Sequence, residues 1–187
     1  MAEAQVLQGT KIEPGIYEID PAHSSITAVA RHLVFTKVRG TFGDFSGTIT
    51  IADPIEDSKV EAVIQASTID TRQPQRDEHL RSGDFLDVEK FPTIEFRTTK
   101  IESRADDHFA VHGDLTIRGV SSPVVIDATF LGPQIDPWGN KRIIFEGKTS
   151  ITREDFGITW NQALETGGVL VSSKLEIELE VQATPRS

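Results

Sequence analysis

Histidine is the residue type in this sequence best suited to move a proton or hold a metal ion near neutral pH. Five are present, at His23, His32, His79, His108 and His112. No His-Glu-x-x-His run occurs and cysteine is absent, so a metal site would have to be assembled from distant segments. His23 follows Asp20-Pro21 at a predicted turn, where its ring can bond neighbouring backbone. His32 follows a predicted strand and is a candidate polar group at a pocket mouth.

Motifs for covalent or acid–base catalysis are equally sparse. The adjacent acids Asp77-Glu78 and Glu154-Asp155 could do acid–base work, but such pairs usually face solvent or cap helices. No serine lies in a Gly-x-Ser-x-Gly turn, and the run GTFGDFSG at residues 40–47 lacks the Gly-Lys-Ser/Thr of a phosphate loop. We therefore expect a protein that is not an enzyme and has no obligatory cofactor.

The charge balance limits the partners. Lys and Arg number 19 and Asp and Glu 29, a net charge of -10, so repulsion opposes binding to nucleic acid or to anionic membrane surfaces. No apolar run approaches the roughly 20 residues that cross a bilayer, so we expect no membrane insertion. Residues 1–15 lack a basic patch followed by an apolar run, which predicts a cytoplasmic location.

Alternation of apolar and polar residues predicts an all-β fold. From Lys174 to Gln182 every second residue is apolar, as in a half-buried strand. Similar segments predict eight or nine strands, at residues 16–19, 24–30, 38–51, 60–69, 93–101, 109–118, 124–131, 143–152 and 174–182. One or two short helices are expected near Arg31–Lys37, where a bulge is the alternative, and near Gln75–Lys90. Residues 1–14 are predicted to form a flexible N-terminal arm, and residues 15–187 a single antiparallel β-barrel domain.

The apolar residues of these strands are predicted to point into the barrel. A barrel of about eight strands is either just filled by side chains or holds one ligand in place of some of them, and the pattern leaves both open. Glycines inside the strands mark bends, and several could also make room for a ligand. The predicted inward set is Ile26, Ala28, Phe42, Ile49, Ile51, Val60, Ala62, Ile64, Ile94, Phe96, Val111, Leu115, Ile117, Val124, Ile126, Ala128, Phe145, Ile151, Leu175 and Ile177.

Four segments, in the same order and spacing, resemble the YceI-like family of lipid-binding proteins. They are YEIDPAHSSI at 17–26, EHLRSGDFLDVEKFPTIEF at 78–96, GDLTIRGVSSPV at 113–124, and TREDFGI at 152–158 followed by Trp160-Asn161. The resemblance covers residues 15 to 182 and implies an extended antiparallel lipocalin-like barrel. Its long apolar tunnel would hold polyisoprenoid chains such as polyprenyl phosphates or the tails of quinones. Many relatives carry an export signal, which we do not expect in this chain, and Ser172-Ser173 stand where Gly-Asp often precedes the last strand.

The resemblance implies non-catalytic binding, carriage or storage of a long-chain isoprenoid lipid, so a bound lipid or quinone is the expected ligand. Candidates to meet its head group are His32, Arg39, His79 and Arg81. Candidates for a lid and tunnel wall, for which ordinary packing of helix on sheet is the alternative, are Leu80, Phe85, Leu86, Phe156 and Trp160. Candidate tunnel contacts along the strands are Ile26, Ala28, Phe42, Ile49, Ile64, Ile94, Phe96, Leu115, Ile126, Phe145, Leu175 and Ile177.

Two other functions stay open at this point. One is an enzyme acting on an apolar isoprenoid-type substrate, with His32 or the Glu154-Asp155 pair as acid and base. The other is a stress-related structural module with a filled core. The sequence also leaves a homodimer open, because dimerisation would protect an exposed strand edge or barrel mouth.

Overall fold

A computed structural model describes residues 12–165 and 169–186 of the chain. Its strands are β1 (Gly15–Ile19), β2 (Ser25–His32), β3 (Thr36–Phe42), β4 (Phe45–Ile51), β5 (Lys59–Gln65), β6 (Ile69–Asp70), β7 (Thr93–Ser103), β8 (His108–Ile117), β9 (Val120–Ile135), β10 (Lys141–Thr152) and β11 (Lys174–Pro185). The α-helix is α1 (Pro74–Arg81), and short 3-10 turns are η1 (Pro21–His23), η2 (Ile55–Asp57), η3 (Ala66–Thr68) and η4 (Arg153–Phe156).

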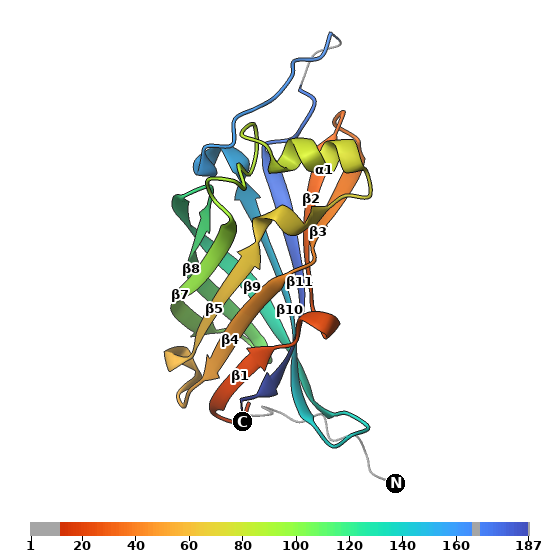
Figure 1. The fold of residues 1–187 in the computed structure, drawn as a ribbon. Helices are drawn as coiled ribbons and strands as arrows, with labels where there is room; N and C mark the ends of the chain where they lie inside the picture. Colours follow the sequence, from red (N-terminus) through yellow and green to blue (C-terminus); the bar gives the residue numbers. More distant parts are fainter. Residues whose placement is uncertain (1–11, 166–168, 187) are drawn as a thin grey trace.

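The sheet closes on itself as an antiparallel barrel. Neighbouring strands follow the order β4, β5, β7, β8, β9, β10 and β11, and β1 pairs with both β4 and β11 to complete the ring. The barrel is elongated, with α1 across one end and the β9–β10 hairpin at the other (Figure 1). We refer to these as the α1 end and the β9–β10 end. The predicted all-β antiparallel barrel of about eight strands is confirmed.

The chain is interrupted at two places near its N-terminal end, between β1 and β2 and between β3 and β4. Between β1 and β2 the chain turns at η1, where the Asp20 carboxylate accepts a hydrogen bond from the Ala22 amide and bonds the His23 ring at 2.8 Å. Gly43 and Asp44 separate β3 from β4, so the predicted strand 38–51 is two strands. The reason is a change of partners: β4 pairs with β1 and β5, whereas β3 pairs with β2 and the short β6.

The expected helix near Arg31–Lys37 is wrong. The segment is the turn of the β2–β3 hairpin, in which His32 pairs with Thr36 and Leu33 and Val34 adopt φ of 52° and 70°. Cross-strand pairing engages the backbone groups that a helical turn would need. The prediction near Gln75–Lys90 is confirmed by one helix, α1, which Pro74 begins and the Gln73 side chain caps by accepting from the Arg76 amide at 2.8 Å.

Buried side chains form three groups along the barrel axis. The group at the α1 end includes Phe45, Phe85 and Phe156, and the middle group includes Phe96 and Val111. The third, at the β9–β10 end, includes Tyr17, Ile51, Phe130 and Ile143. Of the predicted N-terminal arm, residues 1–11 lie outside the described residues, and Ile12 is buried in this third group.

Candidate functional site

The interior of the barrel contains a cavity of about 270 Å³. A cavity needs only about 10–15 Å³ to hold one water, so this space is roughly twenty times larger. The interior is therefore hollow rather than filled by side chains. Of the two outcomes that the strand pattern left open, the structure has the one with room for a ligand.

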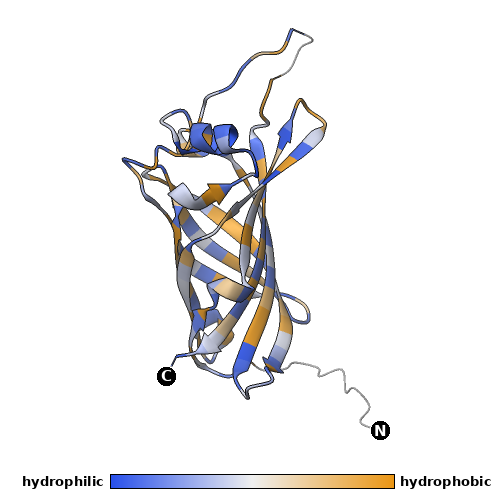
Figure 2. Cartoon of the chain, turned by 45° about the vertical axis from the view of Figure 1, so that its right-hand side comes forward, coloured by the Kyte–Doolittle hydropathy of each residue, from blue (hydrophilic) through white to orange (hydrophobic). Residues whose placement is uncertain are grey.

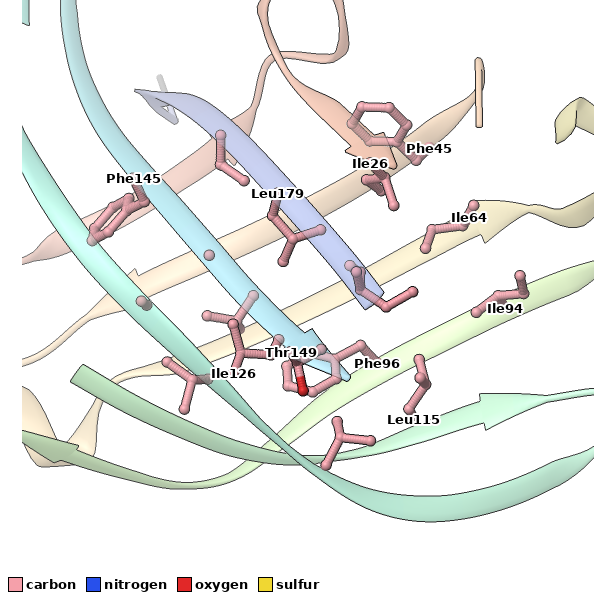
Figure 3. A pocket seen from close by; sticks show the side chains of 18 of the residues that line it. Ile26, Phe45, Ile64, Ile94, Phe96, Leu115, Ile126, Phe145, Thr149 and Leu179 are labelled. Carbon is pink, nitrogen blue, oxygen red and sulfur yellow. The ribbon is translucent and has the colours of Figure 1, made fainter. Parts of the chain in front are cut away.

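Every member of the predicted inward set lines this cavity. The view into the cavity shows side chains of several strands, among them Ile64, Ile94 and Leu115, around the same space (Figure 3). The sequence prediction had not included several further wall residues, namely Ile12, Ile19, Phe45, Ile55, Ile101, Phe109, Ile158, Leu179 and Val181. Contact between these residues and a ligand stays a prediction.

The cavity is long and its wall is apolar. On β11 it extends from Leu175 to Val181, a span of about 20 Å at the usual rise of a strand. Polar wall residues are few, and two of them direct their hydroxyls at backbone: Thr149 donates to the Val125 carbonyl at 2.8 Å, and Ser24 to the Gln182 carbonyl at 3.2 Å. Such a wall offers dispersion contacts along its length and few hydrogen bonds.

Two of the strand glycines make room for neighbouring side chains. A Cβ at Gly113 would lie 2.4 Å from the Phe96 ring, and one at Gly47 would lie 2.6 Å from the Ile19 side chain. The space released at these positions is therefore occupied by the protein itself. Gly147 lies on the cavity wall, and a Cβ there would come within 3.1 Å of the Ile126 side chain and 3.2 Å of the Leu179 side chain.

A lid covers the α1 end, formed by α1, the turns at residues 82–92 and η4 (Figure 1). Of the predicted lid residues, Leu86 and Phe156 line the cavity, and Leu80, Phe85 and Trp160 pack on the same core group without lining it. The His79 ring lies edge-on to Phe85 and Trp160, with centroids 5.0 and 4.7 Å apart. This cluster closes the α1 end with aromatic surface.

None of the four predicted head-group residues lines the cavity. His32 is in the β2–β3 hairpin, and Arg39 forms an outer ion pair with Glu178 at 3.2 Å. His79 bonds the Asp84 carboxylate at 2.8 Å beside the lid aromatics, and Arg81 ends α1. A head-group role for these residues stays a prediction, and in the structure it would require ligand atoms outside the cavity.

Arg153, on η4, is the cation on the cavity wall that sequence reasoning missed. It is 2% exposed, and it donates from Nε to the Ser172 carbonyl at 3.0 Å and from Nη1 to the Trp160 carbonyl at 2.6 Å. Nη2 is buried and has no hydrogen-bond partner among the described residues. Arginine is seldom buried, so only its place in the TREDFGI segment could have drawn attention to it.

Two further features of the described residues bear on function. Within 12–165 and 169–186, no three His, Asp or Glu side chains lie close enough together to hold a metal ion. Over the same residues, no helix has the length and apolar character needed to cross a membrane.

Comparison with known proteins places this barrel in a family. The model of the YceI-like domain matches residues 17–183. The chain belongs to the YceI-like family. Similar relatives are a UPF0312 protein of Shewanella denitrificans, 36% identical over 95% of this chain and 92% of the relative, and one of Vibrio campbellii, 39% identical over 76% and 77%.

Solved structures of the YceI-like family and of similar proteins share the fold. The Campylobacter jejuni YceI protein aligns with a TM-score of 0.72 at 29% identity, over 84% of this chain and 90% of that one. BcnA of Burkholderia cenocepacia aligns with a TM-score of 0.78 at 20% identity, over 89% and 99%. A polyisoprenoid binding domain of Saccharophagus degradans aligns with a TM-score of 0.70 at 12% identity, over 93% and 100%. The last two likenesses establish the fold alone.

Proposed function

We propose that this YceI-like protein binds the apolar chain of an isoprenoid lipid inside its barrel and carries or stores it without changing it chemically. The observation that carries the proposal is the elongated, apolar-walled cavity of about 270 Å³. Family membership supports it, and so does the shared fold with a protein described as a polyisoprenoid binding domain. The lipid would be a polyprenyl phosphate or an isoprenoid quinone.

The energetics favour a long chain over a compact ligand. Each buried CH2 group contributes about 0.8 kcal/mol, so a few isoprene units supply substantial gross affinity. Ordering a flexible chain opposes this gain. Affinity should therefore rise with chain length until the cavity is filled and then level off.

The placement of titratable groups supports binding rather than catalysis. An acid–base catalyst must reach the reacting atoms of a bound substrate. His32, Glu154 and Asp155 do not line the cavity, and the Glu154 carboxylate accepts a hydrogen bond from the Ser173 hydroxyl at 2.8 Å. An apolar chain inside the barrel would meet hydrocarbon side chains along nearly all of its length.

Arg153 supports a position for the head group. It is the cation on an otherwise almost wholly apolar wall, and it lies at the α1 end. The Nη2, which has no hydrogen-bond partner in the part of the chain that the structure describes, could donate to a phosphate or carbonyl oxygen after a small shift of the guanidinium. We therefore place the head group near η4 and the end of the chain toward Tyr17 and Ile51.

The test is to purify the protein, extract it with organic solvent and identify the extract by mass spectrometry. We expect a polyprenyl phosphate or an isoprenoid quinone in near-stoichiometric amount. Isoprenoid alcohols of increasing length, added to stripped protein, should raise its thermal midpoint progressively and then to a plateau. An extract without lipid, together with a thermal midpoint that no isoprenoid raises, would contradict the proposal.

A further inference from the structure

Three consecutive large apolar residues are exposed at the turn of the β2–β3 hairpin. Leu33, Val34 and Phe35 have 46%, 55% and 84% of their surface accessible, and Val169 on the adjoining loop has 42%. These four residues are termed the apolar tip. Figure 2 shows hydrophobic colouring at the end of this hairpin, which projects beyond the barrel rim. Exposed apolar surface of this kind commonly marks contact with a partner or a membrane.

The apolar tip is held in place by the backbone around it. The Leu33 amide donates to the Leu170 carbonyl at 3.1 Å, and Arg31 exchanges hydrogen bonds with Ser172 through its amide and its carbonyl. These bonds attach the hairpin to the loop that bears Val169. Val34, a β-branched residue, adopts φ of 70°, a conformation that such residues rarely take. Backbone strain that is kept at an exposed turn points to a role for that turn.

The hairpin is basic although the chain is acidic. Residues 31–39, RHLVFTKVR, include three cations and no acid, in a chain of net charge -10. Arg31 and Lys37 face each other as a cross-strand pair, and neither forms an ion pair with a carboxylate among the described residues. Arg39 pairs with Glu178, and the described part of the adjoining loop carries one acid, Glu165. The local charge around the apolar tip is therefore positive.

The apolar tip lies closer to Lys37 than to the acidic face of β11. Lys37 is two residues from Phe35, or about 7 Å along the strand. Glu176 faces Val29, four residues from Leu33, or about 13 Å, and Glu178 is further away. The Debye length at physiological ionic strength is about 8 Å. A surface touching the apolar tip would thus interact with the cations and be largely screened from the acids.

The β9–β10 end provides a contrast. Leu131, Ile135 and Trp138 are 52%, 70% and 82% exposed there. The neighbouring cations Lys141 and Arg142 are, however, paired with carboxylates. Of the two ends, within the described residues, the α1 end combines exposed apolar side chains with unpaired cations.

We propose that the apolar tip docks on the surface of a bilayer that contains anionic phospholipid. Phe35 and Val34 enter the boundary between head groups and acyl chains, and Arg31 and Lys37 meet the anionic head groups. Docking at the apolar tip brings the α1 end of the barrel, with its lid, against the membrane. An isoprenoid lipid dissolved in that membrane would then be next to the cavity.

The test is co-sedimentation of the purified protein with vesicles of phosphatidylcholine and phosphatidylglycerol, compared with phosphatidylcholine alone. We expect binding to the mixed vesicles, weakened by salt. Phe35→Ser should weaken it about tenfold or more, the loss expected for an aromatic side chain that no longer enters the bilayer. Lys37→Glu should weaken binding to the mixed vesicles and not to phosphatidylcholine alone. Trp138→Ser, equally exposed at the opposite end, is the control and should bind as the wild type does.

Several results would overturn the proposal. They are failure of the wild type to bind either vesicle, an unchanged affinity for Phe35→Ser, or an equal loss for Trp138→Ser. Conversion of a wild-type dimer to a monomer by Phe35→Ser, without vesicle binding, would identify the apolar tip as an interface between two copies instead. These vesicles contain no isoprenoid, so failure here leaves the proposed cavity function standing, and an empty cavity leaves docking standing.

Discussion

The two ends of the barrel are held together by different interactions. At the β9–β10 end, Arg142 bridges the Asp20 carboxylate at 2.7 Å and the Asp136 carboxylate at 3.3 Å, and this joins the β9–β10 hairpin to the turn before β2. At the α1 end, Arg153 donates to backbone carbonyls and lies 3.8 Å from the Glu154 carboxylate, and the lid aromatics pack in the core group of the same end. One end relies on ion pairs that are partly accessible to water, and the other mainly on hydrogen bonds from a buried cation to carbonyls.

We infer from this difference that the β9–β10 end mainly stabilises the barrel and that the α1 end serves binding. Side chains at the β9–β10 end are satisfied by fixed partners, so that end is suited to keep the barrel closed. At the α1 end, the Arg153 Nη2 has no hydrogen-bond partner among the described residues, and Arg31 and Lys37 of the β2–β3 hairpin form no ion pair with a carboxylate there. Groups without partners are available to a ligand or a surface, and we therefore place both proposed activities at the α1 end.

The largest effect is expected from Arg153→Met. The substitution leaves the carbonyls of Ser172 and Trp160 without their donor, and an unsatisfied buried polar group costs about 1–3 kcal/mol. We expect the free energy of unfolding to fall by about 3 kcal/mol, as measured by urea denaturation. A loss below about 1 kcal/mol would show that Arg153 does not brace the lid.

Asp77→Ala tests a second contact that holds the lid, between α1 and Thr71. The buried Asp77 carboxylate accepts hydrogen bonds from the Thr71 amide at 2.9 Å and from the Thr71 hydroxyl, so its removal should cost about 2 kcal/mol. Glu78→Ala changes the exposed neighbouring acid and should alter the midpoint of urea denaturation little. Equal effects of the two substitutions would argue against a structural role that is specific to Asp77.

Arg142→Met addresses the β9–β10 end and should have a smaller effect. Its side chain is 17% exposed and those of Asp20 and Asp136 are 21% and 9% exposed, so water screens part of each attraction. We expect a fall in stability in urea denaturation that is clearly smaller than that of Arg153→Met. The comparison of the two ends fails if the order of the two losses is reversed.

The smallest effect is a pH dependence that belongs to the β9–β10 end. The hydrogen bond from Arg142 is the main cause that lowers the pKa of Asp20 below its ordinary 3.8. A lowered folded-state pKa stabilises the protein above the unfolded-state pKa, and this contribution is lost as the pH falls through the folded-state pKa. Denaturation midpoints of the wild type should therefore fall as the pH is lowered through and below 3.8. They should fall less steeply for Arg142→Met, and equal slopes would exclude this coupling.

Much of the barrel could be predicted because a strand has a period of two. Alternation in segments such as 174–182 identifies the inward side chains without any knowledge of strand pairing. Every residue of the predicted inward set lines the cavity. The interruption at Gly43 and the turn at Leu33 could not be predicted in the same way. They depend on β3 leaving the line of β4 to pair with β2, which is a matter of tertiary pairing.

The candidate site could be predicted only in part from the sequence. Leu86 and Phe156 were predicted as lid residues and lie on the cavity wall. The volume of the cavity depends on how far apart opposite walls stand, which no local pattern encodes. Arg153 can be buried because the carbonyls of Trp160 and Ser172 accept its hydrogen bonds, and this depends on tertiary structure. Its residue type alone favours exposure.

The most direct test of the central claim is to fill the cavity. Ala62 lines it, and the adjacent Glu61 faces solvent on the same strand with 58% of its side chain exposed. Ala62→Phe and Glu61→Phe therefore add the same ring to opposite faces of β5, and native mass spectrometry can measure the isoprenoid bound to each. We predict that Ala62→Phe stays folded and loses most of the bound lipid while Glu61→Phe keeps it. Equal lipid content in two folded variants would contradict binding inside the barrel.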